Sequence, residues 1–323
     1  MALLDNNALP IITWLPPESI DVSVEGLRLD DVNKTGRWSD VTGYASRELA
    51  ITTAGDTRQT AGRPVDNRKF ANQIRIKPLT GSADTIIEVA KMNGGDDLHR
   101  PTLDEKETWF FRGFWKSDQS STGVKALLRV EAEGASAAIY TTSYTIGTSW
   151  SEFLVVAEVT SHPPSGATNY NNWEISPRIT VNNGQSTHTV RVRGVSAGRC
   201  LNFSKNVVFD RDITRKAAMS TSISGVVQTD LWHTKSMISV SSFDEDYDFW
   251  RNANDFFRDS SAGVNWGFAN DRTSHSKNWF PQLALAQNAG FSEIPVGAER
   301  YRINVKGQEQ IYPVTKQPMG IEV

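Results

Sequence analysis

Residues 123–131 read Gly-Val-Lys-Ala-Leu-Leu-Arg-Val-Glu, a stretch in which apolar side chains recur at every second position. A β-strand turns successive side chains to opposite faces, so this period of two is typical of a strand with one buried face. The buried set would be Val124, Ala126, Leu128 and Val130, and the set between them is Lys125, Leu127, Arg129 and Glu131. This stretch therefore predicts one strand of an antiparallel sheet.

The same alternation recurs on both sides of this stretch. Gly-, Asn- and Pro-containing clusters, such as Asn93-Gly94-Gly95 and Pro163-Pro164, separate the repeats as turns would. Many short strands without a long helix favour a mainly β fold, an antiparallel jelly-roll β-sandwich. The recurring apolar rows are Ile74 and Ile76; Ile87 and Val89; Phe153, Val155, Ala157 and Val159; and His188, Val190 and Val192.

Three parts of the chain differ in pattern. Residues 1–34 are broken by Pro10, Pro16 and Pro17, and we expect an extended N-terminal arm there. Residues 35–205 carry the two-residue period of the sandwich. Residues 206–323 predict a smaller α+β region for assembly, with one amphipathic helix over about 243–258. Ser242 and Glu245 form a capping-box pattern at the start of this helix.

Composition narrows the classes of function. The 323 residues have a net charge of −3, so no overall positive field points to nucleic acid. Cys200 is the single cysteine, which excludes an internal disulfide and a cysteine zinc site. The first residues lack the basic start and apolar run of a signal peptide, and no apolar stretch is long enough for a membrane span. We therefore expect synthesis in a cytoplasm, without membrane insertion.

The middle of the chain resembles the jelly-roll carbohydrate-binding modules that accompany glycoside hydrolases and occur in phage tail proteins. The likeness lies in Glu107–Ser117, in the strand at Gly123–Val130 and in Tyr144–Phe153, and it covers 35–205. It implies a sandwich and, more weakly, sugar binding, because a fold alone does not fix a function. The closing strand of the family often carries an acidic pair, where this chain has Arg193-Gly194-Val195. We therefore expect no calcium site of the family type.

Aromatic and amide side chains cluster near predicted loops and could contact sugar. Aromatic planes stack on the apolar faces of sugar rings, while amides reach the hydroxyl groups. The alternative is a loop packed by its own aromatic residues. The candidate sugar-binding residues are Tyr140, Tyr144, Tyr170, Trp173, Asn171 and Asn172.

Basic residues occupy outward positions of three predicted strands. If those strands are neighbours, the cations form a positive face that could bind an acidic subunit or an anionic glycan. The alternative is a solvated sheet face balanced by Glu131 and Glu133. The members of this predicted basic face are Arg112, Lys116, Lys125, Arg129, Arg191 and Arg193.

No metal-binding, nucleotide-binding or nucleophile motif stands out, so we expect no cofactor, no metal and no enzyme activity. The leading hypothesis is a virion structural protein of a tailed bacteriophage, in a tail, fibre or head decoration, that binds copies of itself and neighbouring virion proteins. Its jelly roll would serve either as a scaffold or as an adhesin that binds a host-surface glycan. The alternatives are a stand-alone carbohydrate-binding module and a glycan-cleaving enzyme with an unrecognised carboxylate pair. Aromatic residues concentrate in interface cores, and the predicted interface residues are Trp14, Trp232, Trp250, Trp266, Trp279 and Phe280.

Overall fold

The computed structural model has two compact units, which we describe separately. Unit 1 comprises 1–14 and 201–323, and unit 2 comprises 15–200. The structure describes the following residues: 2–3, 10–15, 20–21, 27–28, 39–40, 70–71, 73–76, 84–88, 92–93, 106–120, 123–133, 138–143, 146–159, 169–182, 189–203, 207–221, 227–264, 266–269, 279–285, 290–293 and 300–309.

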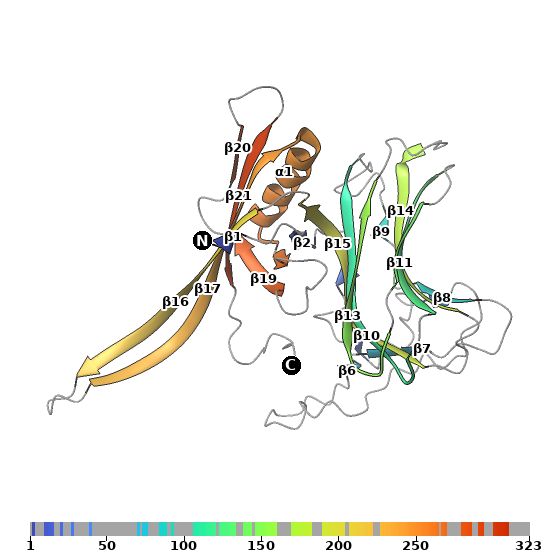
Figure 1. Cartoon of the computed structure of the whole chain (residues 1–323), viewed down its shortest axis with the longest axis horizontal. Helices are drawn as coiled ribbons and strands as arrows, with labels where there is room; N and C mark the ends of the chain where they lie inside the picture. Colours follow the sequence, from blue (N-terminus) through green and yellow to red (C-terminus); the bar gives the residue numbers. More distant parts are fainter. Residues whose placement is uncertain are drawn as a thin grey trace. The chain divides into compact units, whose positions relative to one another are not determined.

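Unit 2 is a sandwich of two antiparallel sheets (Figure 1). The first sheet has the order β13-β10-β15, and both β7 and β3 also pair with β15. The second sheet has the order β12-β11-β14-β8-β5, with β9 paired to β14. The first-sheet strands are β3 (Ile20–Asp21), β7 (Gln73–Ile76), β10 (Thr108–Ser117), β13 (Ser151–Glu158) and β15 (Val190–Asn202). The second-sheet strands are β5 (Ser39–Asp40), β8 (Thr85–Glu88), β9 (Met92–Asn93), β11 (Val124–Glu133), β12 (Ala138–Ser143) and β14 (Asn169–Val181). A separate two-stranded sheet consists of β4 (Leu27–Arg28) and β6 (Phe70–Ala71).

The core of unit 2 lies between these sheets and follows the two-residue period. On β11 the alternate residues predicted to be buried are buried, and they face the aromatic residues of β10 and β13. The rings of Phe111 and Trp115 contact Phe153 at centroid distances of 5.0 and 4.8 Å. The predicted mainly β, antiparallel sandwich is therefore confirmed.

Unit 1 consists of antiparallel strands with one helix on them (Figure 1). The strand order is β1-β16-β17-β21-β19-β18-β2, and β20 also pairs with β21. The strands are β1 (Ala2–Leu3), β2 (Ile11–Trp14), β16 (Val207–Thr221), β17 (Val227–Glu245), β18 (Trp266–Ala269), β19 (Trp279–Leu285), β20 (Gly290–Glu293) and β21 (Tyr301–Glu309).

The expected arm over 1–34 differs from the structure at Ile11–Trp14. These four residues form β2, a fully buried strand that pairs with β18 in the sheet of unit 1. The prolines do not prevent this pairing because Pro10 and Pro16 flank the strand and remove no hydrogen bond within it. At least this part of the N-terminal segment is core rather than an arm.

The helix α1 spans Tyr247–Ser261, later than the predicted range of about 243–258. Its N-cap is Asp246, whose Oδ1 accepts a hydrogen bond of 2.9 Å from the backbone nitrogen of Phe249. Ser242 Oγ donates to Glu245 Oε1, a bond between side chains and not the side-chain-to-backbone pairing of a capping box, and both residues belong to the end of β17. The buried side of the helix carries Asn252, Ala253, Phe256, Phe257 and Ser260.

Candidate functional site

Cations occupy directly opposite register positions on three neighbouring strands of the first sheet of unit 2, and among them the side chain of Arg75 lies outside the described residues. Lys116 of β10 pairs with Arg191 of β15, and Arg191 pairs with Arg75 of β7. Lys116 and Arg191 are both partly exposed. Residues directly opposite on neighbouring strands are close, and like charges at such positions repel each other. We call the register positions of Lys116, Arg191 and Arg75 the cationic row.

Trp150 lies at one end of the cationic row. It precedes β13, and Lys116 Nζ sits 5.0 Å from the centroid of its partly exposed ring. The turn before Trp150 is held against β10 because Ser117 donates its backbone N–H to the carbonyl of Gly147 at 2.9 Å. An aromatic ring beside a cation offers an apolar plane and a charge to one ligand.

Arg112 lies further along β10 on the same face but is neutralised. Its guanidinium bonds to Glu152 of β13, and both side chains are largely buried, at 14% and 3% exposed. Burial lowers the pKa of Arg112, while the charge of Glu152 and its hydrogen bond raise it. Arginine keeps its charge at neutral pH despite such shifts, so this is a stable ion pair and not a free cation.

The predicted basic face is only partly correct, because its members divide between the two sheets. Arg112, Lys116, Arg191 and Arg193 are on the paired strands β10 and β15 of the first sheet, and Arg193 pairs with Phe114. Lys125 and Arg129 are on β11 of the second sheet. The side chain of Arg193 lies outside the described residues. The six cations therefore do not form a single face.

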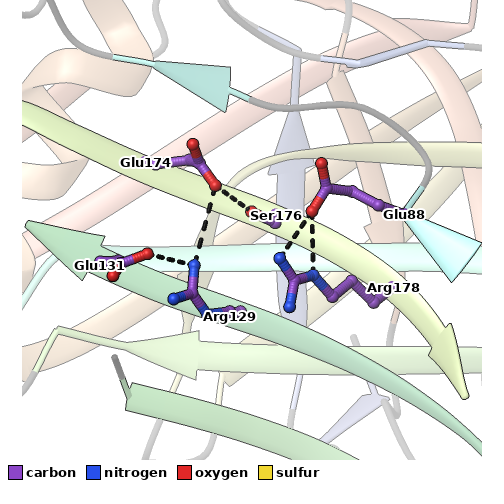
Figure 2. A network of polar contacts seen from close by, with 6 residues as sticks. All are labelled: Glu88, Arg129, Glu131, Glu174, Ser176 and Arg178. Atoms are coloured by element: carbon purple, nitrogen blue, oxygen red, sulfur yellow. Dashed lines mark hydrogen bonds and ion pairs between the residues drawn. The ribbon is translucent and has the colours of Figure 1, made fainter. Parts of the chain in front are cut away.

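The second sheet carries a polar network on its outer face (Figure 2). Arg178 of β14 donates from Nε and Nη2 to Glu88 Oε2 of β8, at 3.0 and 2.7 Å. Arg129 of β11 lies between Glu131 and Glu174, as Figure 2 shows. Ser176 Oγ donates to Glu174 Oε1 at 2.7 Å.

Every charged group of this network is paired, with three carboxylates around two guanidinium groups. Each of its charged groups has an oppositely charged neighbour, and the Arg178 and Glu88 side chains are only 14% and 5% exposed. A buried guanidinium that binds a carboxylate through two nitrogens fixes the alignment of β8 on β14. For Arg129, the ion pair to Glu131 supports the balanced-face alternative. We therefore interpret the network as structural and the cationic row as the candidate binding site.

The predicted sugar-binding residues do not form a described cluster. Tyr140 of β12 is the cross-strand partner of Leu128 of β11. Tyr170, Asn171 and Asn172 fall where the β11–β14 register shifts, between the pairs Ala132–Trp173 and Glu133–Asn169. The side chains of Tyr140, Tyr170, Asn171 and Asn172, and the whole of Tyr144, lie outside the described residues.

Trp173 corrects the sequence-based expectation of a sugar contact. Its side chain is 2% exposed, belongs to the core of unit 2 and meets Trp109 at a centroid distance of 5.6 Å. A ring buried to this degree presents no face to a sugar. The physical reason is alternation, because Trp173 shares the inward side of β14 with Ile175 and Ile179.

Two predicted interface residues are also core residues. Trp14 and Trp266 are each 1% exposed and both contact Phe256 of the helix. Trp250 is partly exposed and stacks between Tyr247 and Tyr301, at 5.3 and 5.2 Å. For Trp232, Trp279 and Phe280 the structure gives positions in β17 and β19, and their side chains lie outside the described residues.

Sequence reasoning missed a buried ion pair in unit 2. Arg199 Nη2 lies 3.9 Å from Glu107 Oε1, and the two side chains are 0% and 1% exposed. Glu107 Oε2 also accepts a hydrogen bond of 3.2 Å from Trp109 Nε1. The two partners are far apart in sequence, and only the pairing of β10 with β15 brings them together. Trp150 and Arg75 were missed as well, because only cross-strand register places them beside Lys116 and Arg191.

Two features are absent among the described residues. No group of three His, Cys, Asp or Glu side chains there could hold a metal ion. Among the same residues, no helix is long and apolar enough to cross a membrane.

The site and the sandwich define a two-layer antiparallel β protein, and comparison with known proteins gives the following likenesses. No protein-family model and no curated protein matches the chain. Among solved structures, the family 30 carbohydrate-binding module of a Clostridium thermocellum cellulosomal cellulase matches at 12% identity and TM-score 0.31, covering 55% of this chain and 97% of that one. The N-terminal cellulose-binding domain of Cellulomonas fimi β-1,4-glucanase C matches at 12% identity and TM-score 0.25, covering 42% and 84%.

A bacteriophage protein is similar to the same extent. The enzymatically active domain of tailspike protein 4 of bacteriophage CBA120 matches at 15% identity and TM-score 0.26, covering 43% of this chain and 17% of that one. With TM-scores this low, none of these likenesses assigns a function.

Proposed function

We propose that this chain is a non-catalytic carbohydrate-binding protein whose sandwich holds an anionic glycan across the cationic row. The observation that carries the proposal is the direct register of Lys116, Arg191 and Arg75 on three adjacent strands. Carboxylate or sulfate groups spaced along a glycan form charge-assisted hydrogen bonds with ammonium and guanidinium groups. Trp150, beside Lys116, would stack on a sugar ring.

The proposal is tested by affinity electrophoresis of the full chain through polygalacturonate, with neutral xylan as the comparison gel. The double variant Lys116→Gln/Arg191→Gln should bind polygalacturonate at least about tenfold more weakly, a loss of about 1.4 kcal/mol. Lys125→Gln is the matched control, because it removes a partly exposed cation from the second sheet. It should leave binding unchanged.

Three outcomes would contradict the proposal. Equal binding by the double variant and the wild type would remove the cationic row as the site. Retention by xylan but not by polygalacturonate would show that the ligand is not anionic. Release of reducing sugar from either polymer would contradict the non-catalytic assignment.

A second candidate is a virion structural protein of a tailed bacteriophage, placed in a tail, fibre or head decoration. The observation that favours it is the long β16–β17 pair of unit 1, whose strands have 15 and 19 residues. Such extended strands suit contacts between subunits in an assembly. Immunogold labelling of purified particles tests this candidate, and particles that never carry the label would exclude it.

A further inference from the structure

The strands β16, β17 and β21 of unit 1 have one face packed against α1 and an opposite face that reaches solvent (Figure 1). On the packed face, Ile238, Val240 and Ile303 share a core with Phe256 and Phe257 of the helix. Successive side chains of a strand point to opposite faces, so the residues between them form the other face. We call this other face the open face, and its side chains, all partly or fully exposed, are the even positions of 208–212, the odd positions of 237–243 and the even positions of 302–308.

Two contacts confirm that β17 and β21 share the open face. Ser241 Oγ donates to Asn304 Oδ1 at 3.1 Å. The guanidinium carbon of Arg302 lies 4.5 Å from the centroid of the Phe243 ring. The open face is therefore one continuous surface across the two strands.

The middle strand of the open face exposes two large apolar side chains. Met237 is 39% exposed and Phe243 is 42% exposed, and both belong to β17. Four large apolar side chains are exposed among the described residues, so half of them lie on this one strand face. The residues between them are the small Ser239 and Ser241, which allow another surface to approach β17 closely. Covering this strand would remove apolar area from water.

The charges of the open face are sorted by strand. On β16 they are the exposed carboxylates of Asp210 and Asp212, and on β21 they are the cations of Arg302 and Lys306. Neither Asp210 nor Lys306 forms an ion pair with another described residue. One edge of the open face is thus acidic and the other is basic, with β17 between them.

The register makes this face complementary to itself. Asp210 pairs with Ser239, and Ser239 pairs with Lys306, so the three residues form a row across the strands. A two-fold axis that runs along β17 turns the row over, so that Asp210 of one copy faces Lys306 of the other. Stacked sheets lie about 10 Å apart, a gap that an extended lysine and an aspartate can span. On the axis, Met237 and Phe243 each meet the same residue of the second copy.

We propose that the open face is a dimer interface, in which two copies of this chain stack these strands about a two-fold axis along β17. Asp210 of each copy pairs with Lys306 of the other, and the apolar residues of β17 are buried between the copies. The order acid, serine, cation favours a second copy as the partner, because a two-fold axis matches each charge with its opposite. The inference is independent of the glycan proposal, which concerns only unit 2.

The test is the molar mass of the full chain by light scattering, from about 1 μM to about 1 mM protein, where wild type should pass from monomer to dimer. Asp210→Lys and Lys306→Asp each place like charges opposite one another, and each should weaken dimerisation at least about tenfold. The double variant Asp210→Lys/Lys306→Asp reverses the row and should dimerise as wild type does. An equimolar mixture of the two single variants should form heterodimers, because every facing pair in the mixture is again of opposite charge.

The control Asn254→Lys adds a cation at an exposed position of α1, on the other side of the strands, and should leave dimerisation unchanged. Because Asp210 and Lys306 reach solvent, the single variants should keep the unfolding temperature that wild type has as a monomer. If one of them does not fold, Ser239→Lys replaces it, since it sets two cations against each other on the axis. A wild type that stays monomeric, a mass that rises beyond the dimer, single variants that dimerise normally, or a double variant no better than the singles would overturn the proposal.

Discussion

The indole nitrogen of Trp14 donates a hydrogen bond of 2.9 Å to Asp259 Oδ2, across 245 residues of sequence. The Trp14 ring also meets Phe256 edge-on at 5.3 Å. Asp259 lies in the last turns of α1, so these contacts fasten the buried strand β2 to the helix that covers the sheet of unit 1. The N-terminal residues are thereby part of the fold of unit 1 although the rest of that unit begins about 190 residues later, at Leu201.

Asp259→Ala should lower the free energy of unfolding by about 1–3 kcal/mol, because it leaves the partly buried indole N–H of Trp14 without this acceptor. Urea denaturation followed by fluorescence measures the change. Asp248→Ala is the control on the same helix, since its carboxylate is 46% exposed and pairs with Arg251 at 3.7 Å. The control should lose less than about 1 kcal/mol. If both variants lost the same free energy of unfolding, the hydrogen bond between Trp14 and Asp259 would make no specific contribution to stability.

The buried pair of Glu107 and Arg199 should be the most sensitive polar contact in unit 2. Arg199→Met should cost about 3–5 kcal/mol, because the carboxylate of Glu107 would remain buried without that guanidinium. The double variant Glu107→Leu/Arg199→Met should recover most of this loss, since it removes both charges. Thermal unfolding of the two variants gives the comparison, and a double variant less stable than the single one would contradict the explanation.

The adjacent residue provides a control for burial. Lys106 pairs with Glu158 at 3.1 Å, but both side chains are 44% exposed. Lys106→Met should therefore change stability by less than about 1 kcal/mol. A loss as large as that of Arg199→Met would show that solvent exposure does not govern these ion pairs.

The sandwich could be predicted from the sequence because burial on one face imposes a period of two. The alternation of Val124, Ala126 and Leu128 indicates a strand even when its partner strands are unknown. The cationic row could not be predicted in the same way. Lys116, Arg191 and Arg75 lie on strands that meet only after folding, and a shift of one residue in the register would place Arg191 on the core side.

The longest strands escaped prediction for a different reason. Within β17, the stretch from Gln228 to Ser236 has no regular apolar alternation, and only short pieces such as Met237–Val240 looked strand-like. Without such alternation, the sequence pattern gives no signal for a strand. The capping-box pattern failed because Ser242 and Glu245 satisfy each other at the end of β17, one turn before the helix begins at Tyr247.

Gly113 should resist replacement even by alanine. A Cβ at this position would lie 2.7 Å from Phe153 Cζ and 3.2 Å from Val195 Cγ2, within the packed core. Gly113→Ala should therefore destabilise the protein by about 1–3 kcal/mol, as overpacking does. The matched control is Gly147→Ala, where an added Cβ meets no atom within 4 Å. Differential scanning calorimetry should show a lower melting temperature for the first variant and little change for the second.

Two tryptophans of unit 2 should separate stability from ligand binding. Trp173 is 2% exposed in the core, so Trp173→Ala should cost about 3–5 kcal/mol of unfolding free energy. Trp150 is partly exposed and contacts Lys116 by its ring face, so Trp150→Ala should cost only about 0.5–1 kcal/mol. It should nevertheless weaken retention by polygalacturonate, because the plane beside the cationic row is lost. Chemical denaturation measures the stability of both variants, and affinity electrophoresis measures their binding to polygalacturonate. If Trp173→Ala kept full stability and lost ligand binding while Trp150→Ala kept both, the binding face would have to be moved from the first sheet to the second.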